Sequence, residues 1–75
     1  MEKRIFKTRF KKNHPLSDNY YVKDRVMRVS IALVGKATAV DINNFTLLNE
    51  GTAEDYEKFK AFMERRYRGL CEFDI

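Results

Sequence analysis

The strongest constraint on the fold lies between Val26 and Ile42, where apolar and polar residues alternate on both sides of the dipeptide Gly35-Lys36. Alternation with a period of two is typical of a β-strand that has one buried face. A two-residue connection with glycine first favours a type II′ turn between adjacent antiparallel strands. In that register the apolar residues of both segments share one face, and a slip by one residue would separate them. The pattern therefore predicts a β-hairpin over residues 26–42.

Two interpretations of the next segment stay open. Asn43 and Asn44 interrupt the alternation, and the mostly apolar residues 45–48 follow them. Either a β-bulge lies within one long strand, or an Asn-Asn turn leads into a short further strand.

The N-terminal segment, residues 3–11, also alternates and predicts a half-buried strand. Phe6, Thr8 and Phe10 share one side of it. The opposite, mostly basic side carries Lys3, Ile5, Lys7, Arg9 and Lys11. The following residues 13–19 hold the only proline of the chain and predict a loop.

Residues 53–68 predict a helix. Thr52 suits the N-cap position, and Gly69 suits a left-handed residue just past the C-terminus. Apolar residues recur at helical spacing at Tyr56, Phe59, Phe62, Met63 and Tyr67.

The tail, residues 71–75, alternates again and predicts a short closing strand. If this strand pairs with the first one, Glu72 and Asp74 face Lys7 and Arg9 across the pair. Whether the tail pairs in this way stays open, as does the order of the strands.

Together these segments predict an α+β fold with a small antiparallel sheet of three or four strands and one C-terminal helix on one face. The expected order is strand, strand, strand, an optional fourth strand, helix and an optional closing strand. A length of 75 residues predicts a single domain over residues 1–75 without a linker.

Catalytic and metal-binding residue types are scarce. Cys71 is the only cysteine and His14 the only histidine, which excludes an intrachain disulfide and a His/Cys zinc site within one chain. Cys71 follows a helix C-terminus, where the helix dipole raises the pKa of a thiol, and His14 is expected to be solvent-exposed. We therefore expect no enzymatic activity, no cofactor, no metal and no small-molecule substrate.

The N-terminus has no apolar signal-peptide region, and no apolar stretch approaches the ~20 residues that span a bilayer. We therefore expect an intracellular, cytoplasmic protein that does not act at a membrane.

The net charge of +4 is unevenly distributed, because residues 1–12 hold six basic residues and one acidic residue. A basic strand can follow a nucleic-acid backbone, and Tyr20 and Tyr21 could stack on bases. Nucleic acid, either DNA or RNA, is the favoured partner by a narrow margin. The predicted contacts are Lys3, Arg4, Lys7, Arg9, Lys11, Lys12 and Arg28, the last on a neighbouring strand.

The same basic residues have a structural interpretation, because lysines on an edge strand prevent edge-to-edge aggregation and the acidic tail could neutralise them. The alternative function is a protein–protein interaction module: a homodimer, a subunit, or a phage- or mobile-element-type inhibitor of a host protein. Its predicted surface is the apolar second face of the sheet, formed by Val26, Ala32, Val34, Ala37 and Ala39.

Overall fold

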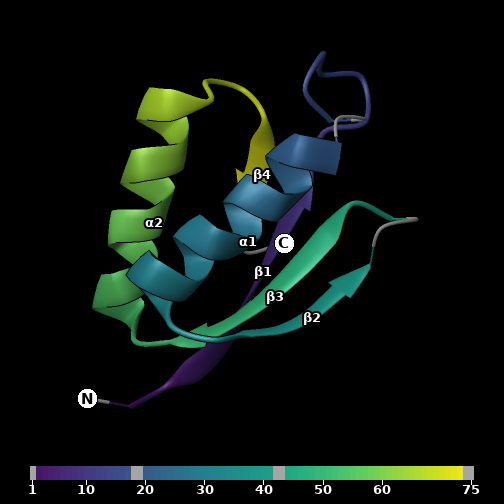
Figure 1. The fold of residues 1–75 in the computed structure, drawn as a ribbon. Helices are drawn as coiled ribbons and strands as arrows, with labels where there is room; N and C mark the ends of the chain where they lie inside the picture. Colours follow the sequence, from purple (N-terminus) through teal and green to yellow (C-terminus); the bar gives the residue numbers. More distant parts are fainter. Residues whose placement is uncertain (1, 18–19, 42–43, 74–75) are drawn as a thin grey trace.

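The computed structural model describes residues 2–17, 20–41 and 44–73, and the side chains of residues 20–23 are not described. The elements in chain order are β1 (Arg4–Phe10), α1 (Tyr20–Val34), β2 (Ala37–Asp41), β3 (Thr46–Gly51), α2 (Ala53–Arg66) and β4 (Cys71–Phe73). The strands form one sheet in the order β2-β3-β1-β4, in which all neighbours are antiparallel. Both helices lie on the same face of this sheet (Figure 1). The α+β class and the antiparallel sheet are confirmed, and the connectivity is that of the split β-α-β, or ferredoxin-like, arrangement.

The central strand β1 has the two faces that its alternation predicts. Phe6, Thr8 and Phe10 are buried toward the helices, and the residues between them are exposed. The open question of the tail is answered, since β4 pairs with β1 and Glu72 lies opposite Arg9. The other predicted acidic position, Asp74, lies outside the described residues.

The predicted hairpin over residues 26–42 is wrong, because its first half belongs to helix α1. Residues four apart share a face in a strand and also in a helix, so a short alternating run does not distinguish the two. Val26, Ser30 and Val34 are four residues apart and are all fully buried. The Ser30 hydroxyl donates to the Met27 carbonyl 2.8 Å away, which satisfies a polar group on the buried side of the helix. The fold therefore contains two helices rather than the single C-terminal helix expected.

Gly35 ends α1 instead of opening a hairpin turn. Its φ of +93° is in the left-handed region that commonly follows a helix C-terminus. The true hairpin joins β2 to β3, which excludes one long strand through this segment. Asn44 lies in a turn between these strands, whereas Asn43 lies outside the described residues. The backbone amide and side-chain amide of Asn44 donate to the Asp41 carboxylate at 3.2 and 2.7 Å, which closes this turn.

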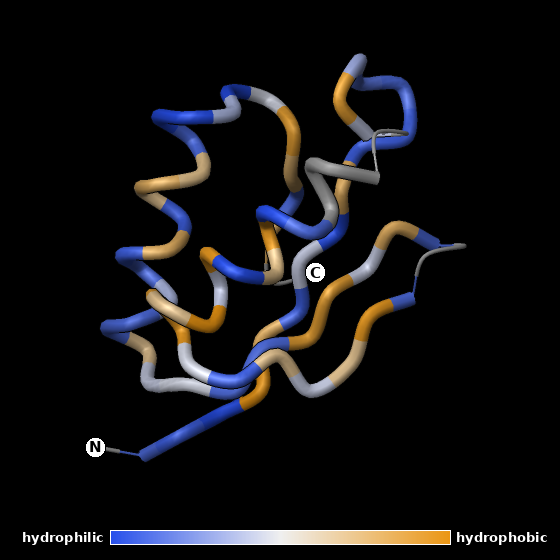
Figure 2. Tube along the Cα trace, in the orientation of Figure 1, coloured by the Kyte–Doolittle hydropathy of each residue, from blue (hydrophilic) through white to orange (hydrophobic). Residues whose placement is uncertain are grey.

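Helix α2 confirms the one helix that the sequence predicts, although it ends two residues earlier than expected. The Thr52 hydroxyl caps it by accepting from the Asp55 amide at 3.1 Å. Hydrophobic residues recur along both helices and alternate along the strands (Figure 2). The core between helices and sheet consists of Phe6, Phe10, Val26, Val34, Leu47, Tyr56, Phe59, Met63, Leu70 and Cys71.

Two close contacts fix α2 and α1 against the sheet. The Tyr56 ring stacks on Phe6 with centroids 4.2 Å apart, and its hydroxyl donates to the Lys7 carbonyl at 3.1 Å. At Gly51 the backbone of β3 passes so close to the end of α1 that an added Cβ would lie 2.0 Å from the Val34 carbonyl oxygen. Only glycine fits at that position.

Candidate nucleic-acid interface

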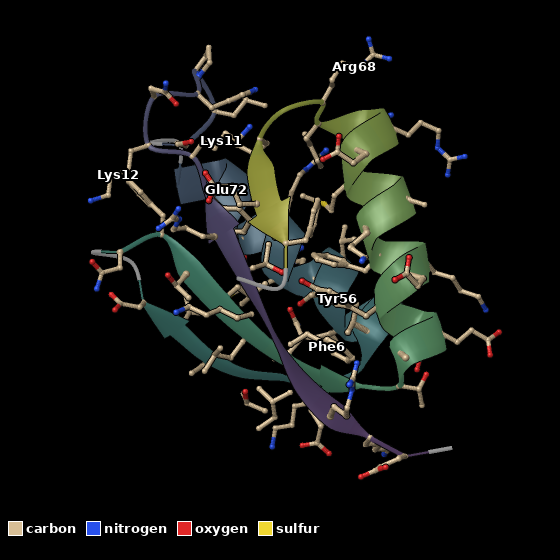
Figure 3. All side chains as sticks on the ribbon, turned by 180° about the vertical axis from the view of Figure 1, so that it is seen from behind. Phe6, Lys11, Lys12, Tyr56, Arg68 and Glu72 are labelled. Atoms are coloured by element: carbon tan, nitrogen blue, oxygen red, sulfur yellow. The ribbon has the colours of Figure 1, made fainter. Side chains whose placement is uncertain are left out.

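One face of the sheet points away from both helices, and no other described element packs over it (Figure 3). We call it the open face. The strand registers assign to it the side chains of Ile5, Lys7, Arg9, Ala39, Asp41, Thr46, Leu48, Glu50 and Glu72. It is therefore a mixed surface, with apolar residues at its centre and charges of both signs around them.

A shallow hollow of about 500 Å³ lies on the open face, and three of its lining residues are basic. Lys7 and Arg9 enter it from β1, where their spacing of two puts both side chains on the same side. Lys12 follows the end of the strand, and its ammonium lies 6.0 Å from the centroid of the Phe45 ring. The remaining lining residues are Ala39, Val40, Asp41, Asn44, Thr46 and Leu48.

A second hollow, of about 510 Å³, adjoins the first at the end of β1. Arg9 and Lys12 line both hollows, and Lys11 lines the second. Figure 3 shows Lys11 and Lys12 beside Glu72 at this end of the strand. Four basic side chains, those of Lys7, Arg9, Lys11 and Lys12, therefore form one continuous group, which we call the basic end.

Backbone hydrogen bonds hold the basic end in place. The Lys11 amide donates to the Leu70 carbonyl at 2.8 Å, and the Lys11 carbonyl accepts from the Ser17 hydroxyl. His14 belongs to the same loop and is half-buried, whereas it was expected to be solvent-exposed. Its Nδ1 accepts from the Leu16 amide at 3.1 Å. These bonds order the backbone of this loop before a ligand binds, so less backbone entropy is lost on binding.

The acidic tail neutralises part of the basic end. Arg9 forms an ion pair with Glu72, and both side chains stay substantially exposed, at 51% and 36%. The structural interpretation of the basic strand as a self-paired ladder therefore applies to Arg9. Among the described residues, neither Lys7 nor Lys12 takes part in an ion pair.

The other predicted nucleic-acid contacts are not at this site. Lys3 and Arg4 are at the opposite end of β1, and the Arg4 guanidinium lies 4.8 Å from the centroid of the Phe6 ring. Arg28 is on helix α1 instead of a neighbouring strand, and it pairs with Asp24 at 3.2 Å. The side chains of Tyr20 and Tyr21 lie outside the described part of the structure.

The predicted protein interface is also dispersed. Val26 and Val34 are fully buried in the core, because they are on the inner side of α1. Ala32 is exposed on that helix, Ala37 is half-buried, and Ala39 is on the open face. These residues do not form one surface, since the sheet face that was expected to carry them does not exist.

Thr46 and Leu48 of β3 also line the hollow and were not among the predicted site residues, and Ala39 of β2 was predicted only for a protein interface. The alternation of Thr46, Leu48 and Glu50 was a usable signal for an exposed strand face. Their position beside Lys7 and Arg9 depends on the pairing of β1 with β3, which no local pattern encodes.

Nucleophilic and metal chemistry find little support in the described residues. Burial, and to a lesser extent the negative charge of Glu64, raise the pKa of the Cys71 thiol from 9.0 to about 12. The described residues contain no group of three metal-ligating side chains. No helix in this part of the chain has the length and apolarity needed to cross a membrane.

Comparisons with known proteins give no further guide to the role of this surface. The chain matches no protein-family model, no curated protein and no solved structure.

Proposed function

We propose that the protein is a non-enzymatic module that binds the phosphate backbone of nucleic acid at the basic end of the open face. The observation that carries this proposal is the hollow lined by Lys7, Arg9 and Lys12 on a sheet surface that no described element covers. Lysine and arginine side chains that neutralise phosphates release condensed counterions, which drives binding and makes it depend on salt.

The composition of the open face favours contacts with the backbone over contacts with bases. Sheets of the same strand number that read single-stranded RNA stack bases on aromatic side chains of their central strands. Here the open-face positions of β1 and β3 are occupied by Ile5, Lys7, Arg9, Thr46, Leu48 and Glu50. None of these residues is aromatic, so we expect little preference for sequence and a comparable affinity for DNA and RNA.

Affinity should be modest, because acidic groups compete with phosphate for the same cations. Glu72 engages Arg9, and Asp41 lines the same hollow as the three basic residues. Lys7 and Lys12 then provide most of the attraction at low salt.

The proposal is tested by a salt titration of binding to mixed-sequence DNA and RNA. We expect the Lys7→Ala/Arg9→Ala/Lys12→Ala variant to lose most binding and to reduce the slope of log K against log salt by about 2 to 3. The control Lys58→Ala/Arg65→Ala/Arg68→Ala makes the same change in charge at exposed positions in and after α2. It should retain the slope.

Absence of binding at low salt would refute the proposal, because electrostatic attraction is strongest there. Equal losses in the two triple variants would also refute it, since they would show a response to net charge instead of to the basic end.

A second candidate function is association with protein. It is favoured by Ile31 and Val40, two of the three large hydrophobic side chains that are exposed in the described part of the chain.

A further inference from the structure

Strand β2 is an edge of the sheet, since only β3 neighbours it. Natural proteins usually protect such an edge with lysine, proline, a covering segment or a very short strand. The other edge, β4, carries the charged residue Glu72 at the centre of its described residues, Cys71–Phe73. In β2 the interior positions are Thr38, Ala39 and Val40, all exposed and all uncharged.

A strip of apolar side chains runs along this edge. Val40 is 39% exposed and, together with Met27 of α1, lines a small apolar recess. Ile31 is 55% exposed and follows Met27 by four residues, which places it on the same side of the helix. We call Met27, Ile31 and Val40 the edge strip. It provides hydrophobic area beside a row of backbone groups that no described strand pairs.

We propose that β2 is the docking edge for a second copy of this chain, with the two β2 strands antiparallel about a two-fold axis between Thr38 and Ala39. In this register Ala37 lies opposite Val40 of the second copy. Lys36 lies opposite Asp41 of the second copy, and the two-fold axis repeats this pairing of opposite charges. Opposite charges directly across a strand pair are favourable, so the strand is complementary to itself.

The backbone of β2 supports the same register. The Lys36 carbonyl accepts from the Glu50 amide at 3.0 Å, so the polar groups of Lys36 face β3. In an antiparallel ladder the next residue faces the other way, so the amide and carbonyl of Ala37 point to the free edge. The bulge between Ala37 and Ala39 inserts one extra residue, after which Val40 points to that edge as well. The register that pairs the charges therefore also pairs these two outward-facing residues.

The resulting dimer would contain one continuous sheet, to which each copy contributes its four strands. Residues directly opposite each other share a face, so both open faces would lie on one side and both edge strips would meet on the other. The two β1 strands would be about 24 Å apart, from five strand spacings. The dimer does not depend on the proposed nucleic-acid function, although it would present two basic ends to one ligand.

The test is the molar mass of the full chain in the absence of nucleic acid, measured by sedimentation equilibrium from low micromolar to several hundred micromolar. We expect the mass to rise with concentration from 8.9 kDa to twice that value. Ile31→Lys should weaken the dimer at least tenfold. Ile5→Lys is the matched control, because Ile5 is 62% exposed on the open face, away from β2, and it should leave the dimer intact.

Lys36→Glu tests the register, because it places like charges opposite each other. We expect it to weaken the dimer at low salt and to lose most of this effect at 0.5 M salt, where the Debye length falls to about 4 Å. Circular dichroism establishes that each variant is folded.

A chain that stays monomeric at several hundred micromolar would overturn the proposal. A dimer that is broken by Ile5→Lys and not by Ile31→Lys would also overturn it, since the interface would then be on the open face. Nucleic-acid binding by a strictly monomeric protein would separate the two proposals by retaining the first and rejecting the second.

Discussion

The two faces of the sheet differ most clearly along β1, which contributes buried side chains to one face and exposed, mostly basic side chains to the other. Toward the helices, Phe6, Thr8 and Phe10 of β1 are 3%, 0% and 7% exposed. On the open face, the alternate residues Lys7 and Arg9 are exposed and line a hollow. Because the side chains of a strand alternate, substitutions at Phe6, Thr8 and Phe10 should act on stability, and those at Lys7 and Arg9 on binding. The predictions below test this separation.

The largest effect is expected at Gly51, on the covered face. In Gly51→Ala the new Cβ would lie 2.0 Å from the Val34 carbonyl oxygen, so β3 and the end of α1 must move apart. We expect a loss of about 3 kcal/mol or more in the free energy of unfolding, measured by urea denaturation.

Gly69→Ala is the matched control for this substitution. Gly69 has a φ of +76°, and an added Cβ there meets nothing within 4 Å. Only backbone strain opposes this change, so it should cost about 1 kcal/mol. Equal losses at the two glycines would show that close packing at Gly51 is not what matters.

The next effect is expected at the buried hydroxyl of Tyr56. Tyr56→Phe removes the donor to the Lys7 carbonyl and leaves the fully buried Thr8 hydroxyl without its neighbour at 3.0 Å. The unfolding free energy should fall by about 1 to 2 kcal/mol, with no change in nucleic-acid binding. Tyr67→Phe, at a half-buried position, provides the comparison and should cost less. A binding defect in Tyr56→Phe would break the separation of the two faces.

Cys71 is buried on the face that the helices cover, so its thiol should react slowly with alkylating reagents. Burial raises the pKa of its thiol to about 12, so the reactive thiolate is scarce at pH 8. Iodoacetamide should label the folded protein slowly and the urea-unfolded protein rapidly. Between pH 9.0 and about 12 the thiol of the unfolded chain loses its proton, whereas the buried thiol of the folded protein keeps it. The contribution of Cys71 to the free energy of unfolding is therefore fully present below pH 9.0 and declines as the pH rises toward 12. Fast labelling of folded protein would show that β4 opens readily.

The smallest effect on stability is expected at Glu72, which follows Cys71 in β4 and lies on the open face. Glu72→Gln removes an exposed ion pair with Arg9, which should change the unfolding free energy by less than about 1 kcal/mol. The same substitution removes a negative charge from the basic end. We expect nucleic-acid binding at low salt to strengthen by about threefold, since one nearby unit charge in water is worth roughly 1 kcal/mol at most. Weaker binding would mean that Glu72 positions Arg9 for its ligand.

The parts of the fold that local sequence predicts are those with signals of more than one kind. In α2, the helical spacing, the Thr52 cap and the glycine after the helix all agree, and in β1 the alternation extends over the whole strand. In α1, the period of four fitted both a strand and a helix, and the following Gly35 suited a hairpin turn as well as a helix end. Only tertiary contacts distinguish the helix from the strand here, namely the burial of Ser30 and the close approach of Gly51 to Val34.

The candidate site was predictable only where it follows β1. Lys7, Arg9, Lys11 and Lys12 are close in sequence, so their clustering is local. Arg28 was expected beside them only because α1 was taken for a strand. Leu48 and Thr46 reach the site through a pairing with β1 that spans some forty residues of chain, which composition and spacing do not reveal.

The position of β1 between β3 and β4 has a consequence for folding during synthesis on the ribosome. β1 is synthesised before both of the strands that flank it, so it can be flanked on both sides only when β4 has emerged, and Arg9 and Glu72 are 63 residues apart. At 5–20 residues per second the ribosome needs roughly 3 to 13 s to cover that distance. During this interval β3 and α2 can already cover one edge and the inner face of β1, whereas its other edge, at Thr8, Arg9 and Phe10, still lacks the strand that pairs with it in the finished fold.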